Sequence, residues 1–266
     1  MGGFCGLGLS GVRILVTASS SGIGFGVAKV VGSCGARVAI NGRDPDRLRR
    51  AAEKLDSMGV DAHPIEADLS VEGAGARLVR EAVEALGGLD SVVFIPPPPP
   101  GGRFLELGMD SWRASYRLLV EAGLEIIYES ISFLKESRNP SITVITSIAA
   151  WEPLPGIATS SVLRPALHGL VTLLARELGS LGIRVNGIVP GYILTDRLRE
   201  VAAMRAKARG TSIDDELKLL AGEVPLGRVG APEDIGWLVA FLASPQARYI
   251  NGALIPVSGG LHRSTR

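Results

Sequence analysis

The chain has few of the residues that build a disulfide framework, a metal centre or a membrane span. Its 266 residues include two cysteines, Cys5 and Cys34, and three histidines, and no cysteines stand at metal-ligand spacing. No apolar run approaches the ~18 residues that a membrane span requires. A disulfide-rich scaffold is therefore excluded, and we expect no metal, no membrane contact and a reducing, cytoplasmic location.

The chain also lacks an excess of charge of either sign. Lys and Arg total 28 against 27 Asp and Glu, which gives a formal net charge of +1. Binding of nucleic acid or of an anionic membrane rests largely on basic surface, and this balance offers no support for either partner. We expect a small molecule as the partner instead.

What the sequence does contain is a regular alternation of short apolar runs and longer amphipathic segments. Seven apolar runs are typical of strands: Arg13–Val16, Val38–Ile40, Ala62–Ile65, Ser91–Ile95, Ile142–Thr146, Arg184–Val189 and Ala253–Val257. Helical spacing predicts helices near Gly22–Ser33, Val71–Leu86, Asp110–Ser137, Ser161–Leu181 and Pro232–Ala243, and one that Asp44 caps and Pro45 begins. Apolar strands separated by helix-length crossovers predict a doubly wound α/β fold, with one seven-stranded parallel sheet in a single domain over 1–266.

One segment departs from this alternation. Residues 195–224, Thr195 to Val224, are rich in Arg, Lys and Glu, and they contain two helix-like pieces separated by Gly210-Thr211-Ser212. Doubly wound sheets bind ligands at the carboxyl ends of their strands, so an insertion after a strand end predicts a lid over the site. A solvated pair of surface helices or a subunit contact explains the same pattern equally well.

The first predicted strand is followed by a turn of small residues that opens a helix. It reads Thr17-Ala18-Ser19-Ser20-Ser21-Gly22-Ile23-Gly24. Small side chains allow backbone N–H groups and the positive end of a helix dipole to approach a pyrophosphate closely. The turn therefore indicates a phosphate-binding site, although a glycine-rich turn with no ligand has the same composition.

This turn and later motifs together resemble the short-chain dehydrogenase/reductase family, and within it the members similar to 3-oxoacyl-carrier-protein reductase. The family's turn is Thr-Gly-x-x-x-Gly-Ile-Gly, with Ala18 here in place of its first glycine. Further matches, spread over nearly the whole chain, are Asp68-Leu69, Thr146-Ser147, Asn186, Pro190-Gly191 and Ser258-Gly259-Gly260. The resemblance implies a Rossmann fold, a nicotinamide cofactor, an oxidoreductase activity and assembly as a homodimer or homotetramer.

The resemblance also places the cofactor. In dinucleotide folds a carboxylate after the second strand holds the ribose hydroxyl of NAD, whereas an arginine accommodates the extra phosphate of NADP. This strand is followed by Arg43 with no carboxylate before it, which favours NADP(H) over NAD(H), although a solvated turn arginine is the alternative. The other expected cofactor-binding residues are Ala18, Ser20, Ser21 and Ile23 at the pyrophosphate, Asp68 and Leu69 at the adenine, and Pro190, Gly191, Ile193 and Thr195 at the nicotinamide.

Most residues that carry the family's reaction are replaced. The family uses a Tyr-x-x-x-Lys pair, in which the phenol protonates the developing alkoxide, and these positions are Ser160 and Arg164 here. The family's asparagine falls on Leu119, and Ser147 alone is kept. A serine hydroxyl is a far weaker acid than a phenol, and an arginine fork is not equivalent to an ammonium group. The resemblance thus implies a degenerate catalytic tetrad, with Ser147, Ser160 and Arg164 as the candidate catalytic residues.

Two further departures bear on activity. Tyr192, beside the expected nicotinamide, is the candidate substitute acid, whereas His168 is interpreted as a packing residue. Where the family has Asn-Asn-Ala-Gly, the chain has Phe94 followed by Ile95 and a run of prolines, which either substitutes structurally or narrows the dinucleotide cleft. Two functions remain open. The first is an NADP(H)-dependent oxidoreductase that acts on a carbonyl or hydroxyl substrate by a modified proton path, and the second is an inactive dinucleotide-binding sensor or structural subunit.

Overall fold

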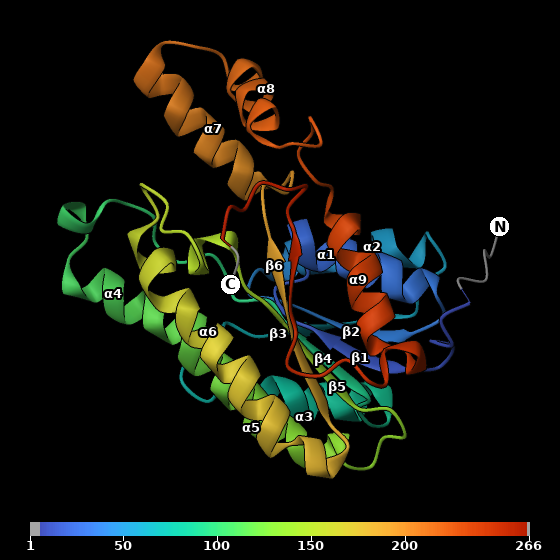
Figure 1. Cartoon of the computed structure of the whole chain (residues 1–266). Coiled ribbons are helices and arrows are strands. Elements are labelled where there is room, and N and C mark those ends of the chain that lie inside the picture. Colours follow the sequence, from blue (N-terminus) through green and yellow to red (C-terminus); the bar gives the residue numbers. More distant parts are fainter. Residues whose placement is uncertain (1–5, 265–266) are drawn as a thin grey trace.

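A computed structural model describes residues 6–264, which fold around one seven-stranded sheet (Figure 1). The strand order is β3-β2-β1-β4-β5-β6-β7, and every neighbouring pair is parallel. The strands are β1 (Arg13–Val16), β2 (Arg37–Gly42), β3 (Ala62–Glu66), β4 (Ser91–Phe94), β5 (Ser141–Ile145), β6 (Arg184–Pro190) and β7 (Leu254–Val257). The predicted doubly wound sheet is confirmed, because each apolar run forms a strand at or close to its predicted bounds.

The helices follow the crossover pattern expected of such a sheet. They are α1 (Gly22–Ser33), α2 (Pro45–Asp56), α3 (Ala74–Leu86), α4 (Met109–Tyr116), α5 (Ala122–Leu134), α6 (Ala158–Glu177), α7 (Asp196–Arg209), α8 (Ile213–Glu223) and α9 (Pro232–Ala243). The carboxylate of Asp44 accepts a hydrogen bond from Arg47 N at 2.9 Å, as predicted for the cap of α2. The predicted helix Asp110–Ser137 is α4 and α5 joined by a π-helical turn at Arg117–Glu121.

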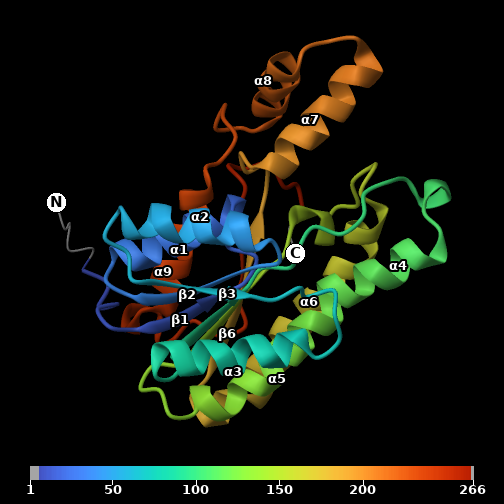
Figure 2. The same ribbon diagram turned by 180° about the vertical axis from the view of Figure 1, so that it is seen from behind.

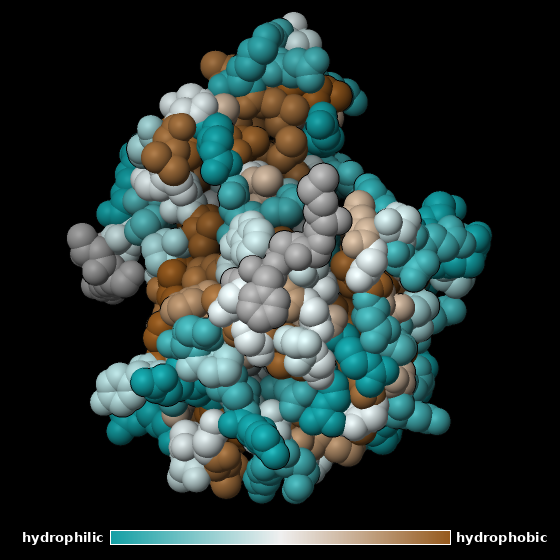
Figure 3. Space-filling view, turned by 90° about the vertical axis from the view of Figure 1, so that its right-hand side faces the viewer, coloured by the Kyte–Doolittle hydropathy of each residue, from teal (hydrophilic) through white to brown (hydrophobic). Residues whose placement is uncertain are grey.

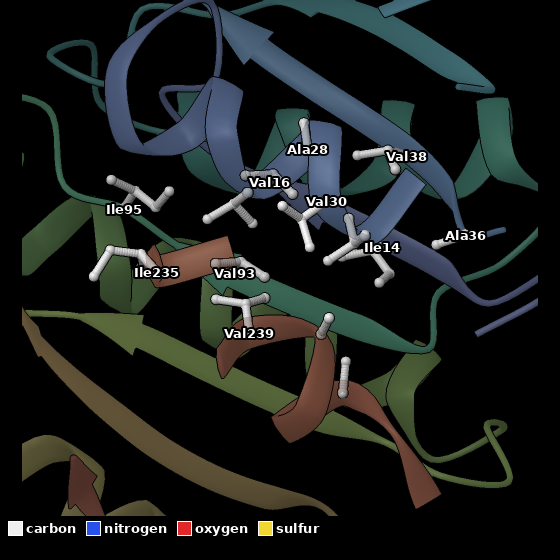
Figure 4. Close-up of a cluster of buried hydrophobic side chains, with 14 of the residues drawn as sticks. Ile14, Val16, Ala28, Val30, Ala36, Val38, Val93, Ile95, Ile235 and Val239 are labelled. Carbon is white, nitrogen blue, oxygen red and sulfur yellow. The ribbon is translucent and has the colours of Figure 1, made fainter. Parts of the chain in front are cut away.

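Helices cover both faces of the sheet (Figures 1 and 2). Alternate side chains of each strand point to opposite faces. Ile14 and Val16 pack with α1 and α9 in one core, part of which Figure 4 shows, while Leu15 packs with α3 and α5 in the other. Because both faces are buried, the carboxyl ends of the strands are the edge at which a ligand can meet the sheet.

The segment 195–224 forms the helices α7 and α8, which project from the body beyond that edge (Figure 1). They are held together by a small apolar cluster of their own, in which Leu198, Ala202 and Leu220 are buried. Met204 and Leu219 are exposed, and apolar surface is visible at this end of the molecule in Figure 3. The two predicted helical pieces are therefore present, and their role as a lid stays a prediction.

Three further sequence expectations concern cysteine, metal and membrane. Cys34, which follows α1, is disulfide-bonded, a bond that the sequence analysis did not predict, and Cys5 lies outside the described residues. Within residues 6–264, no group of three or more His, Cys, Asp or Glu side chains could hold a metal ion. None of the helices in that range combines the length and the apolar character that crossing a bilayer demands.

Candidate functional site

The turn between β1 and α1 is fixed by Asn41 of the neighbouring strand. Ser19 N donates to Asn41 O at 2.7 Å, and Ala18 N donates to Asn41 Oδ1 at 3.2 Å. A Cβ at Gly24 would lie 2.4 Å from Ala18 O, so the helix starts directly against the turn. The hydroxyl groups of Ser20 and Ser21 bond to no other described residue. The first N–H groups of α1 therefore lie beside hydroxyls that no described residue uses, an arrangement that suits an anion.

Ala18 is the position where the chain departs from the glycine of the resembled turn, and its backbone has a φ of +45°. A side chain is strained in this left-handed region. Ala18→Gly is expected to raise the free energy of unfolding by about 0.5–1 kcal/mol, since relief of that strain exceeds the added backbone entropy. Thermal unfolding measures the change.

Ala52→Gly, within α2, is the matched control, because removing a methyl from a helix lowers stability by about 1 kcal/mol. A loss of stability in both variants would show that the turn at Ala18 carries no relievable strain.

At the ends of β2 and β3 the structure brings Arg43 and Asp68 close to each other. Arg43 is exposed and has no hydrogen bond or ion pair with a described residue. The pKa of Asp68 is lowered, chiefly by the hydrogen bond from Ser70 N at 2.9 Å and also by the charge of Arg43. A Cβ at Gly42 would lie 3.0 Å from Ser20 Cβ, so the end of β2 packs closely against the turn after β1. Arg43, the next residue, is therefore near that turn. By contrast, the side chain of Leu69 is buried in the core beneath.

The end of β6 lies against the same turn. Thr195 caps α7 by accepting from Leu198 N at 3.4 Å, and its Cγ2 would lie 3.3 Å from a Cβ at Gly22. Pro190 ends β6, and Gly191 N donates to Val257 O at 3.0 Å, while Ile193 is buried in the core. The expected pyrophosphate and nicotinamide segments are thus adjacent at one edge of the sheet.

Two of the candidate catalytic residues, Ser147 and Arg164, lie together at the end of β5. Arg164 Nη1 donates to Thr146 O at 2.8 Å, which holds its guanidinium beside Ser147, the next residue. Ser147 Oγ accepts from Ala149 N at 3.1 Å, so its proton remains available to another acceptor. Ser160 lies one turn before Arg164 in α6, buried and with no hydrogen bond from its hydroxyl to a described residue. Burial, with a smaller contribution from Arg197, lowers the pKa of Arg164 to about 10, which leaves it cationic at neutral pH.

His168, interpreted from the sequence as a packing residue, lies beside the candidate catalytic residues. Its Nε2 lies 2.9 Å from Thr146 Oγ1, and Thr146 Oγ1 is also 3.1 Å from Ile188 O. Trp151 makes an edge contact with the His168 ring, at 5.5 Å between centroids. Burial lowers the pKa of His168, so the ring is neutral at pH 7. Arg164 and His168, one helical turn apart, therefore both fix Thr146, and their i, i+4 spacing was the available signal.

Tyr192 does not present a free phenol to this site. Its hydroxyl donates to Glu223 Oε2 at 2.9 Å, and its ring packs against the apolar cluster of α7 and α8. Burial and the Glu223 carboxylate raise the pKa of Tyr192, which makes it a weaker acid. The geometry therefore gives no support to Tyr192 as the substitute proton donor.

Phe94 does not border the turn after β1, so the interpretation that it narrows a dinucleotide cleft is wrong, whereas the effect of the prolines stays a prediction. Its ring is fully buried in the core on the α3 and α5 side, where a Cβ at Gly123 would lie 2.6 Å from Cε1. Leu119, in the π-helical turn, is also fully buried. The prolines continue from Ile95, whose N and O both bond to Thr17 Oγ1, at 2.7 and 2.9 Å. Phe94 is thus a packing residue, which agrees with the alternative interpretation that this segment has a structural role.

Comparison with known proteins agrees with this architecture. The family model described as enoyl-(acyl carrier protein) reductase matches residues 17–262. The chain is 29% identical to the 3-oxoacyl-[acyl-carrier-protein] reductase FabG of Aquifex aeolicus, over 95% of this chain and 98% of that protein.

Solved structures show the same fold over nearly the full length. The L-sorbose reductase of Gluconobacter frateurii, complexed with NADPH and L-sorbose, has a TM-score of 0.91 at 29% identity, and the match covers 97% of this chain and 99% of that one. A short-chain oxidoreductase of Pseudomonas aeruginosa PAO1, described as containing an atypical catalytic center, has a TM-score of 0.88 at 28% identity, with the same coverage. Sequence motifs, sheet order and these likenesses agree: the chain belongs to the short-chain dehydrogenase/reductase family of oxidoreductases.

Proposed function

We propose that the chain is an NADP(H)-dependent oxidoreductase that reduces a carbonyl or oxidises the corresponding hydroxyl without a tyrosine acid. The observation that carries the proposal is the start of α1, where the hydroxyls of Ser20 and Ser21 and the guanidinium of Arg43 have no hydrogen-bond partner among the described residues. The L-sorbose reductase that this fold matches is complexed with NADPH, which supports the same cofactor here.

The residues present fit a dinucleotide phosphate. Gly24 leaves no room for a side chain between α1 and Ala18 O, so backbone N–H groups form the surface that a pyrophosphate would touch. Arg43 has no acidic partner among the described residues, and its fork suits a ribose 2′-phosphate. Asp68, the nearby carboxylate, follows β3 rather than β2 and is hydrogen-bonded to Ser70, so it does not fill the place of the NAD-selecting carboxylate.

The cofactor preference is tested by calorimetric titration with NADPH and with NADH. Arg43→Ala is expected to weaken NADPH binding by about 10-fold or more and to leave NADH binding unchanged, because one charge-assisted phosphate contact is lost. Arg50→Ala removes the same charge from α2 and should leave both affinities unchanged. Equal binding of the two nucleotides to the unaltered chain would count against the NADP preference, and binding of neither would count against the function.

The hydrogen bonds at the end of β5 support a proton path that does not use tyrosine. A bound nicotinamide supplies the hydride for the carbonyl carbon. Ser147 would donate its free hydroxyl proton to the carbonyl oxygen as a hydrogen bond, while the adjacent Arg164 stabilises negative charge on that oxygen. Neither group is an acid near neutral pH, so we propose that water delivers the proton.

A second function has one specific observation in its favour. Ser160 is a buried residue whose hydroxyl has no hydrogen-bond partner among the described residues, and no phenol stands at this position. A binding protein without turnover would have the same features. Such a protein would bind NADPH with the Arg43 dependence above, yet it would reduce no member of a panel of aldehydes, ketones and oxo acids.

A further inference from the structure

The cationic groups near Ser147 indicate a substrate class, and this inference rests on the proposed oxidoreductase function. We propose that the substrate is a short oxo acid whose carboxylate binds between the guanidinium groups of Arg164 and Arg197, with its carbonyl oxygen toward the hydroxyl of Ser147.

Arg164 has a charge that the protein leaves uncompensated. It is partly buried, and among the described residues its only bond is the one to Thr146 O at 2.8 Å. Arg117, by contrast, is paired with both oxygens of Glu125, at 2.7 and 2.8 Å. Arg184, which is also buried without a carboxylate, has two acceptors, Ala247 O and Asn139 Oδ1. A partly desolvated cation with a single neutral acceptor is costly unless an anion joins it.

Arg197 adds a second positive charge on the same side of the site. It lies in the first turn of α7, and its Nη2 would be 2.8 Å from a Cβ at Gly101. The preceding residue, Pro100, accepts a hydrogen bond from Thr159 Oγ1 at 3.0 Å, at the start of α6 next to Ser160. Glu200 pairs with Nη1 of Arg197 at 3.0 Å, and no carboxylate of residues 6–264 pairs with Nη2. The charge of Arg197 acts unfavourably on Arg164, and an anion between them would remove this repulsion.

The cofactor does not supply this anion. Its pyrophosphate belongs at the turn after β1, and β4 separates β1 from β5 in the sheet. Two strand spacings amount to about 10 Å, so the end of β5 faces the nicotinamide end instead, which carries no negative charge. Because Arg164 is bound to the residue before Ser147, an anion that it holds lies close to the carbonyl site. A carboxylate one or two carbons from the carbonyl fits that separation.

The test compares two probes that have the same ketone and differ in charge, acetoacetate and ethyl acetoacetate. Each is titrated calorimetrically into the full chain saturated with NADP⁺, which prevents reduction. We expect acetoacetate to bind about 10-fold or more tightly, as a charge-assisted contact predicts, and higher salt to reduce the difference. Arg197→Ala should remove most of the preference, while Arg199→Ala, which removes an exposed side chain with no bond to a described residue, should keep it.

Equal affinity for the acid and the ester overturns the proposal, and so does an equal loss of preference in the two variants. Inorganic phosphate that competes as well as acetoacetate does would assign the arginines to free anions and also overturn the substrate class. The same titrations without nucleotide separate this inference from the proposed function. An acid preference in a chain that binds no NADP⁺ contradicts the proposed function alone, whereas NADP⁺ binding without that preference contradicts the substrate class alone.

Discussion

Ser147→Ala is expected to lower the turnover of carbonyl reduction by about 100-fold, the usual effect of losing one hydrogen-bond donor to a developing oxyanion. The hydroxyl is suited to that role because its lone pair is used by Ala149 N while its proton has no acceptor among the described residues. In the variant, the positive charge of Arg164 would still stabilise the developing oxyanion, but the hydrogen bond from Ser147 to that oxygen would be lost. Steady-state kinetics with NADPH and a reducible oxo acid or ketone measures the loss.

The same substitution has a small structural effect that must be separated from catalysis. Ser147 caps the 3₁₀ turn Ile148–Ala150, and removal of such a cap costs about 1 kcal/mol of stability. Ser57→Ala, at the end of α2, also removes a serine hydroxyl bonded to the backbone, at 2.7 Å from Lys54 O. The Ser57→Ala control should unfold at a slightly lower temperature and keep full turnover. Full turnover in Ser147→Ala itself would remove Ser147 from the mechanism.

The sheet and the turn of small residues after β1 were predictable from the sequence because their signals are local. An apolar run buried on both faces, such as Ser91–Phe94, is distinctive over four residues. The cap and proline that open α2 act within one turn of helix. The unusual position of Ala18 was also visible locally, since the resembled turn has glycine there, and the structure gives Ala18 a positive φ.

The arrangement at the end of β5 was not predictable in the same way. The bond from Arg164 to Thr146 joins residues 18 positions apart and depends on how α6 lies across the sheet. The place of Arg197 beside Gly101 depends on the path of two loops. Tyr192 adjoins the expected nicotinamide in sequence, yet its side chain turns toward α7 and α8 and bonds to Glu223. The sequence therefore predicted which segment holds Tyr192, but it could not predict the direction of the Tyr192 side chain, on which a catalytic role depends.

Phe94→Ala is expected to lower the free energy of unfolding by about 3–5 kcal/mol, the range observed when a buried phenylalanine leaves a cavity. The ring is fully buried between β4 and α5, and it lies where a side chain at position 123 would stand. Gly123→Ala should therefore also destabilise, by about 1–3 kcal/mol, because the ring has no free space to enter. Urea unfolding of both variants measures these losses.

Combining the two changes tests the contact directly, since the methyl added at Gly123 would enter the space that the ring leaves. We expect the double variant to lose less stability than the two single losses added, by about 1 kcal/mol or more. Gly169→Ala in α6, which meets no atom within 4 Å, serves as the control for helix propensity and should be neutral or stabilising. Additive losses would contradict the packing. NADPH affinity should be unchanged in Phe94→Ala, because the ring packs in the core against α5 and not at the turn before α1.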